Sequence, residues 1–256
     1  MKLDVVYPLS RMAKGPDDFE LRYSLRSLDR QPWVGNVFIV GHAPTWIKNA
    51  TEIPFPDLWN NNFKDKNIIK KMLQACIDER VSDPFVANSD DQYWLKEIEP
   101  EQMVIPPREN PPQVEVDAKN KRLNPYRPFR NQWVARQSAT VQYLKDRGKC
   151  SIYFDGHVPY LIEKEKYIKT MCHLPWEMGI GFLIVIYHGW NWREISGGID
   201  IKDRDGVLVR IKREMECKEI EENIGDALFL NHNNRAFTEQ MKHFLRKRFP
   251  DKSRWE

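Results

Sequence analysis

Within its first 41 residues the chain alternates between two kinds of hydrophobic pattern, and this alternation constrains the fold more than any other feature. Residues 3–7 form a short apolar run that ends at a proline, which is typical of a buried strand. Residues 18–28 carry apolar side chains three to four positions apart, which predicts an amphipathic helix. Residues 37–40 are again apolar and precede a glycine. A strand, a helix and a strand in succession form a βαβ unit, so we predict a parallel sheet.

The next segments continue this alternation. Residues 51–62 are rich in proline and asparagine and predict a loop, whereas residues 67–79 have the spacing of a helix. Residues 84–88 predict a third short strand. Residues 100–128 hold clustered prolines without any periodicity, so we expect a long surface excursion or lid.

The second half of the chain gives four further predictions. Residues 129–147 predict a helix, and residues 151–154 predict a short strand. Residues 197–213 resemble a hairpin that turns at residues 203–206. Residues 238–249 predict a basic amphipathic helix. Because no repeat or linker interrupts these elements, we expect a single domain over residues 1–256.

Composition and cysteine usage favour a cytoplasmic globular protein. The 256 residues are 41% hydrophobic and 30% charged, and the formal charge of +3 neither requires nor excludes a polyanionic partner. The longest apolar run, residues 179–187, is too short to cross a bilayer, so no transmembrane segment is expected. The four cysteines are scattered, without the spacing of a zinc site or a disulfide framework, which favours a reducing compartment.

An acidic pair, Asp90 and Asp91, follows the strand predicted at residues 84–88. Ligands of open α/β sheets gather at the carboxyl ends of the strands, and two carboxylates there can hold a divalent cation that neutralises a diphosphate. An aspartate pair that caps a turn is the competing interpretation.

Other polar residues also follow predicted strands or begin a predicted helix. His157 follows the strand at residues 151–154 and could accept a proton from an acceptor hydroxyl or contact a phosphate, unless it only satisfies a turn. Arg130 and Asn131 open the helix after the excursion, where a guanidinium group suits phosphate oxygens. Arg11 and Arg22 follow the first strand and have the same two interpretations, phosphate binding or a solvated helix start.

Several separated segments, in order along the chain, resemble the Stealth family of sugar-1-phosphate transferases. The Ser89–Asp90–Asp91 sequence is similar to the family's Asn-Asp-Asp, and His157 with Pro159 is similar to its His-x-Pro. The remaining similar segments are residues 20–28, 32–34, 38–40, 44–47, 229–234 and 244–256.

This resemblance implies a GT-A-like fold, a mostly parallel sheet flanked by helices, in which a nucleotide sugar lies across the strand ends. It implies a donor, most simply a UDP-sugar, and a divalent cation, Mg²⁺ or Mn²⁺, held by Asp90 and Asp91. Catalysis would involve His157, Asp91 and Arg130. The donor-binding residues implied in this way are Asp4, Ser10, Arg11, Arg22, Asn131 and Asn233.

Three functions remain open from the sequence. The first is transfer of a sugar-1-phosphate to an acceptor hydroxyl, and the second is ordinary glycosyl transfer that releases a nucleoside diphosphate. Acceptors of the glycosyl transfer could be a glycan or a hydroxymethylated base in DNA. The third is a non-catalytic sugar- or nucleic-acid-binding protein, which the amides at Asn233 and Asn234 favour because the family carries acidic residues there.

Overall fold

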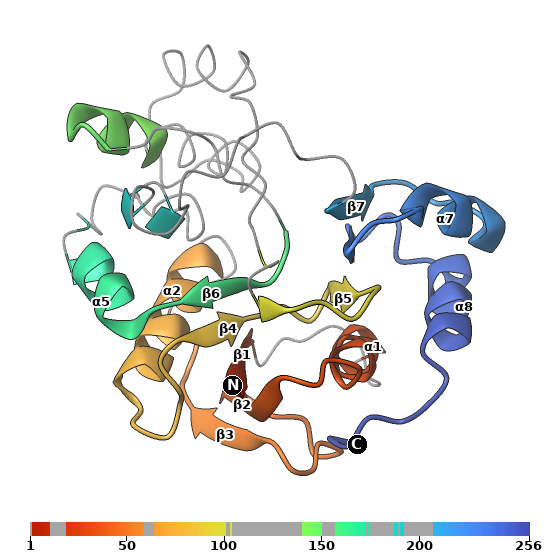
Figure 1. Ribbon diagram of the computed structural model, residues 1–256, viewed down its shortest axis with the longest axis horizontal. Coiled ribbons are helices and arrows are strands. Elements are labelled where there is room, and N and C mark those ends of the chain that lie inside the picture. Colours follow the sequence, from red (N-terminus) through yellow and green to blue (C-terminus); the bar gives the residue numbers. More distant parts are fainter. Residues whose placement is uncertain are drawn as a thin grey trace.

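The computed structural model describes residues 2–10, 19–58, 64–100, 103, 140–149, 157–172, 174, 187, 188, 190, 191 and 207–256. A five-stranded sheet in the order β3-β2-β1-β4-β6 lies at the centre of these residues (Figure 1). Its strands are β1 (Leu3–Leu9), β2 (Val34–Gly41), β3 (Thr51–Pro54), β4 (Phe85–Ala87) and β6 (Tyr160–Ile162). The pairs β1–β2, β1–β4 and β2–β3 are parallel, and β6 runs antiparallel to β4. The predicted α/β class with a mostly parallel sheet is confirmed.

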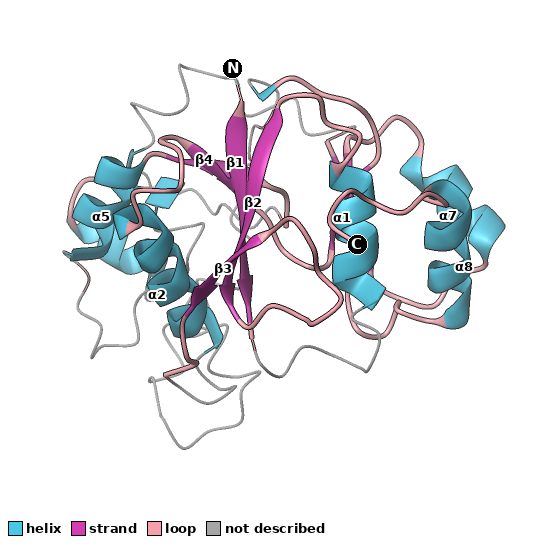
Figure 2. Ribbon diagram, turned by 90° about the horizontal axis from the view of Figure 1, so that it is seen from below, coloured by secondary structure: helices cyan, strands magenta, loops and turns pink. Residues whose placement is uncertain are grey.

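Helices cover both faces of this sheet. Helices α2 (Lys64–Ile77) and α5 (Lys164–Cys172) lie on one face, and α1 (Phe19–Leu28) lies on the other (Figure 2). Residues 3–7 of β1 are all buried between them, which explains the continuous apolar run at the start of the chain. The α1 helix buries Leu21, Leu25 and Leu28 in the same core, as their spacing predicts.

A second, smaller sheet is built from distant parts of the sequence. It has the order β5-β8-β7, with β5 (Gln92–Trp94), β7 (Leu208–Ile211) and β8 (Phe229–His232). Helices α7 (Cys217–Ile224) and α8 (Glu239–Arg248) lie beside it (Figure 1). A separate apolar cluster, which includes Leu230, Ile220 and Phe244, forms the core of this part.

Tryptophans join the two sheets. The ring of Trp94 on β5 lies 5.5 Å from the ring of Trp33 and 5.0 Å from that of Phe229 on β8, measured between centroids. The indole of Trp33 donates a hydrogen bond of 2.8 Å to the carbonyl of Ile98. Because these rings belong to the core of the central sheet, β5 and β8 are anchored to that core.

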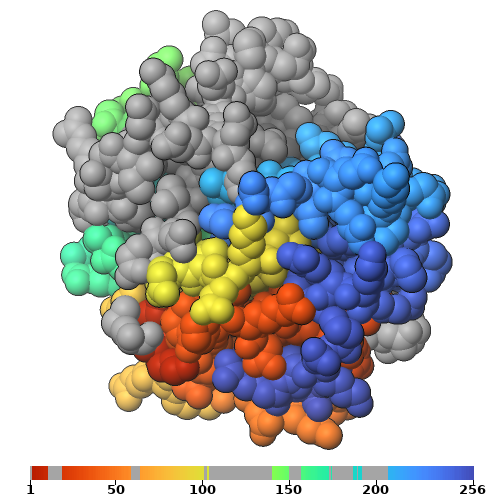
Figure 3. Space-filling model, turned by 45° about the vertical axis from the view of Figure 1, so that its right-hand side comes forward, coloured from red at the N-terminus to blue at the C-terminus, as the bar shows by residue number. Residues whose placement is uncertain are grey.

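The C-terminal residues return to the first helix and to the loop before β3. Glu256 accepts hydrogen bonds from Arg22 and Arg26 on α1, at 2.9 Å and 2.7 Å. The side-chain amide of Asn49 donates to the carbonyl of Arg254 at 2.9 Å. Figure 3 shows these dark blue residues against the orange part of the chain.

The structure corrects one prediction and adds elements that the sequence did not reveal. Residues 51–54 were predicted as loop but form β3, because their backbone completes the edge of β2 with Ile53 buried. The short strands β5 and β6 were not predicted. Residues 208–211 of the predicted hairpin form β7, whose described partner is β8, in parallel, and the first half of the hairpin lies outside the described residues.

Other predictions are confirmed or lie outside the described residues. The basic C-terminal helix is α8, preceded by Thr238, and residues 140–146 are helical within the predicted helix 129–147. The excursion, apart from Pro100 and Met103, the strand at 151–154 and the turn at 203–206 lie outside the described residues. None of the helices described is long and apolar enough to span a membrane.

Candidate functional site

The acidic pair lies where the order of the central sheet reverses. From β1 the chain adds β2 and β3 on one side and then returns to add β4 on the other. The carboxyl ends of β1 and β4 therefore flank the crevice in which open α/β sheets bind their ligands. Asp90 and Asp91 follow β4 in a turn that Gln92 closes by donating its N–H to the carbonyl of Ser89 at 3.2 Å. The same turn starts β5, so the pair lies at the junction of the two sheets.

Asp91 is held as a carboxylate by surrounding positive charge. Burial raises the pKa of Asp91, but the charges of His157, His232 and Lys64 and a hydrogen bond from Asn231 outweigh burial, and the pKa lies below its ordinary value. The Asn231 amide also donates to the Asp91 carbonyl at 2.9 Å, across the sheet junction. The predicted residue His157 thus lies near enough for its charge to lower the pKa of Asp91.

A buried polar chain lies beneath the acidic turn. The Asn88 amide donates to the Tyr7 hydroxyl at 2.8 Å, and that hydroxyl lies 3.0 Å from the Ser24 hydroxyl. Ser24 donates in turn to the carbonyl of Gln92 at 2.7 Å. Burial raises the pKa of Tyr7, and the nearby Asp90 charge raises it further, so the phenol stays protonated. This series of hydrogen bonds ties the ends of β1 and β4 to α1.

A second buried group connects the acidic turn to β8. The Tyr93 hydroxyl lies 2.9 Å from Nε2 of His232, and the same nitrogen lies 3.8 Å from a carboxylate oxygen of Glu20. The imidazole stacks on Phe237 at 4.8 Å between centroids. Burial, followed by the charges of Glu20, Asp91 and Asp90, raises the pKa of Tyr93. These contacts hold His232 in one orientation on the Asp91 side of the second sheet.

Two buried amide oxygens at this site have no hydrogen-bond partner among the residues that the structure describes: Oδ1 of Asn88 and Oδ1 of Asn231. Asn88 is 2% exposed and Asn231 is fully buried. A buried acceptor without a partner is costly, and a cation or a ligand donor would satisfy it. No group of three or more His, Cys, Asp or Glu side chains among the described residues is arranged to hold a metal ion. Two carboxylates with amide oxygens still fit Mg²⁺, which takes much of its shell from water and substrate phosphate.

Ser10, predicted to bind the donor, lies at the carboxyl end of β1 beside an ion pair that the sequence did not reveal. Its hydroxyl donates to Asp57 at 2.7 Å, and Asp57 also pairs with the ammonium group of Lys71 at 2.7 Å. Lys71 is 2% exposed and donates to the carbonyl of Leu9 as well. This buried lysine fixes the chain just after β1. In sequence it is one of many lysines on a helix, so no local pattern distinguished it.

Three other predicted donor residues have structural partners away from the acidic pair. Asp4 lies near the amino end of β1, where its carboxylate accepts backbone N–H groups of Asn36 and Ser82, both at 2.8 Å. Arg22 binds Glu256 and lies 3.9 Å over the ring of Trp46.

Asn233 closes the turn after β8. Its Oδ1 accepts the N–H groups of Arg235 and Ala236, at 3.0 Å and 3.1 Å. The preceding residues Asn231 and His232, rather than Asn233, face the site. Sequence analysis noted residues 229–234 only as a segment similar to the family, and the contacts of Asn231 with Asp91 and of His232 with Tyr93 were needed to select the right ones. Arg11, Arg130 and Asn131 lie outside the described residues.

Comparison with known proteins gives a partial similarity. No family model matches the chain. Over 94 residues the chain is 33% identical to the N-acetylglucosamine-1-phosphotransferase subunits alpha/beta of Mus musculus, and equally to those of Homo sapiens. The similarity covers 33% of this chain and 8% of each relative. The chain therefore spans less than a tenth of the length of these curated relatives.

Proposed function

We propose that this chain is a transferase that moves a sugar-1-phosphate from a nucleotide sugar to an acceptor hydroxyl, in the manner of the Stealth family. The observation that carries the proposal is the acidic pair at the reversal point of the sheet, with Asp91 kept ionised opposite His157. The 33% identity to two N-acetylglucosamine-1-phosphotransferases supports the same class of reaction.

In the proposed reaction an acceptor hydroxyl attacks the phosphorus that carries the sugar. The new P–O bond replaces the bond to the nucleoside phosphate, which leaves as a nucleoside monophosphate. His157 accepts the proton of the attacking hydroxyl, and the negative charge of Asp91 stabilises the imidazolium that forms. The buried contacts of His232 with Tyr93 and Glu20 hold a further imidazole near Asp91, which limits reorganisation during transfer.

The proposed cofactor is Mg²⁺ or Mn²⁺. Asp90 and Asp91 would hold it, and the unpartnered oxygens of Asn88 and Asn231 would face it or its water ligands. Bound there, the ion would neutralise charge on the donor phosphates. Positive groups around a transferring phosphoryl centre supply much of the catalysis in such reactions.

The donor, most simply a UDP-sugar, would lie across the carboxyl ends of β1 and β4. Ser10, positioned by Asp57 and Lys71, lies at that edge and would contact the nucleotide. Arg11, Arg130 and Asn131 remain proposed as donor contacts, and Arg130 as a stabiliser of phosphate charge. The proposed acceptor is a glycan hydroxyl.

One experiment separates this function from its alternatives. The protein is incubated with nucleotide sugars, Mg²⁺ or Mn²⁺ and glycan acceptors, and the released nucleotide is identified by chromatography. A nucleoside monophosphate together with a phosphodiester product supports the proposal. A nucleoside diphosphate would establish glycosyl transfer instead, and a donor left intact with every acceptor, DNA with hydroxymethylated bases included, would indicate a binding protein.

A further inference from the structure

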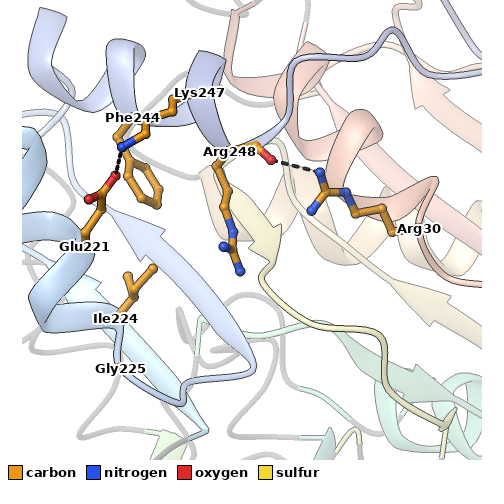
Figure 4. A pocket seen from close by; sticks show the side chains of 7 residues that line it. All are labelled: Arg30, Glu221, Ile224, Gly225, Phe244, Lys247 and Arg248. Carbon is orange, nitrogen blue, oxygen red and sulfur yellow. Dashed lines mark hydrogen bonds and ion pairs between the residues drawn. The ribbon is translucent and has the colours of Figure 1, made fainter.

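A hollow of about 550 Å³ lies between the carboxyl ends of α7 and α8, and its lining does not include the acidic pair. It is bounded by the ends of α7 and α8 and by the residues that follow α1 (Figure 4). The residues that line it are Arg30, Glu221, Ile224, Gly225, Phe244, Lys247 and Arg248. None of them contributes to the site described above.

The charged side chains that line the hollow differ in whether an opposite charge neutralises them. Lys247 is neutralised by Glu221, whose carboxylate lies 2.7 Å from its ammonium group. Arg248 donates to the carbonyl of Leu95 at 3.0 Å, and Arg30 donates to the carbonyl of Arg248 at 2.8 Å. Among the described residues neither guanidinium is paired with a carboxylate. Figure 4 shows the Arg248 side chain extending into the space between Ile224 and Arg30.

The two helix ends do not cancel this charge. Both α7 and α8 terminate at the hollow, and each carboxyl end carries the equivalent of about half a negative elementary charge. Arg30 and Arg248 supply two full positive charges, so the hollow remains positive. A guanidinium presents planar N–H groups that match the oxygens of a phosphate, and it is less strongly hydrated than an ammonium group.

The remaining lining is apolar. Phe244 is 1% exposed and Ile224 is 9% exposed, and both contribute to the wall of the hollow. A side chain at Gly225 would meet no atom within 4 Å, so this edge is open. A space of this size, positive at one side and apolar at the other, suits a phosphate attached to a ring rather than a bare ion.

We propose that this hollow is a second binding site, which takes the phosphate ester of a ring compound, either a sugar phosphate or a nucleotide. Arg30 and Arg248 bind the phosphate, and the ring lies over Ile224 and the open edge at Gly225. The site is independent of the proposed transferase reaction.

The test is an NMR titration of the full chain at low salt, in which the backbone amide signal of Gly225 reports on the hollow. The three probes are inorganic phosphate, a hexose 1-phosphate and a nucleoside monophosphate. We expect at least one ester to shift the signal and to bind about tenfold more tightly than inorganic phosphate, because only the esters bury a ring. The tighter ester identifies the source of the phosphate. Esters that bind no more tightly than phosphate, or an unmoved Gly225 signal, overturn the proposal.

Variants with opposite expected effects on ester binding show that a change in affinity does not come from misfolding, because misfolding would only weaken binding. Arg248→Gln should weaken ester binding about tenfold, since a charge-assisted hydrogen bond is lost. Glu221→Gln should tighten it, because Lys247 is released from its partner. Lys218→Gln is the matched control, since Lys218 is exposed on α7 outside the hollow. Equal affinities in all three variants would refute the assignment. Transfer activity does not enter this readout, so failure here leaves the proposed function untouched.

Discussion

Asp91 and Glu256 are both carboxylates whose pKa lies below the ordinary value, but the causes differ. Burial raises the pKa of Glu256, and direct hydrogen bonds from Arg26, Arg22 and the backbone of Ser253 outweigh it and lower the pKa to about 2. At Asp91 the main opposing influence is the charge of His157, His232 and Lys64. A carboxylate bonded directly on several sides is occupied by the fold. One stabilised mainly through nearby charge keeps capacity for a ligand, and this is the role that we propose for Asp91.

The largest expected effect follows from removing the imidazole of His157, the proposed general base near Asp91. His157→Ala should lower the transfer rate at saturating donor by about a hundred- to ten-thousandfold, the usual contribution of a general base. Donor affinity, measured by calorimetry, should change little. His243→Ala, on the exposed side of α8, is the control and should keep full activity. A His157→Ala enzyme that retains its saturating rate but binds donor weakly would make the imidazole a phosphate contact instead.

Removing the carboxylate of Asp91, the proposed ligand-binding group, should affect activity far more than stability. We expect Asp91→Asn to lower the transfer rate by about a hundred- to thousandfold, as is typical when one preorganised electrostatic group is lost. The melting temperature should stay close to that of the wild type. Asp226→Asn is the control, because Asp226 is an exposed partner of Lys96. Near-normal turnover in a folded Asp91→Asn protein would show that the acidic pair only shapes the turn.

Removing the carboxylate of Glu256 should lower stability and leave activity unchanged. Glu256 is 3% exposed, and Glu256→Gln should reduce the free energy of unfolding by about 2 kcal/mol, since charge-assisted hydrogen bonds to two arginines are weakened. Denaturant unfolding measures this loss, and the transfer rate per folded molecule should be unchanged. Glu239→Gln, which breaks an exposed pair with Lys242, should leave the unfolding midpoint where it is.

The pH dependence of the stability lost in Glu256→Gln tests the cause of that loss. The pKa of Glu256 is about 2 in the folded chain, against an ordinary value of 4.5. Its contribution to stability is therefore present in full above pH 4.5 and is lost as the pH falls toward 2. The difference in stability between wild type and Glu256→Gln should narrow over that range. A constant difference would mean that the stabilisation does not come from the ionised carboxylate.

The smallest expected effect is on the Mg²⁺ requirement, and it distinguishes Asn231 from Asn233. In the described part of the chain, Oδ1 of Asn231 has no hydrogen-bond partner, whereas Oδ1 of Asn233 accepts two backbone N–H groups. Asn231→Ala should raise the Mg²⁺ concentration needed for half-maximal transfer about tenfold, the usual size of an outer-ligand effect. Asn233→Ala should lower thermal stability and leave the Mg²⁺ requirement alone. The same Mg²⁺ dependence in both variants would remove Asn231 from the proposed metal site.

Sequence analysis was most successful where structure depends on local pattern. The apolar run of β1, the helical spacing of α1 and the position of Asp90 and Asp91 after β4 could each be read from neighbouring residues. It failed at β3 and β5, whose short sequences carry no distinct period and whose pairing comes from strands elsewhere in the chain. Lys71 was missed because its partners, Asp57 and the carbonyl of Leu9, come from other elements.

By itself, the sequence determined the βαβ unit, the parallel sheet and the placement of an acidic pair at its carboxyl edge, because hydrophobic period sets which face of an element is buried. Only the tertiary structure brought Asn231 to the carbonyl of Asp91, a partner 140 positions away, and His232 to Tyr93 and Glu20. Such contacts depend on strand pairing between distant segments, and the identity of either residue alone does not encode them. Tertiary contacts of this kind therefore decide the difference between the bonded carboxylate of Glu256 and that of Asp91, for which we propose a ligand.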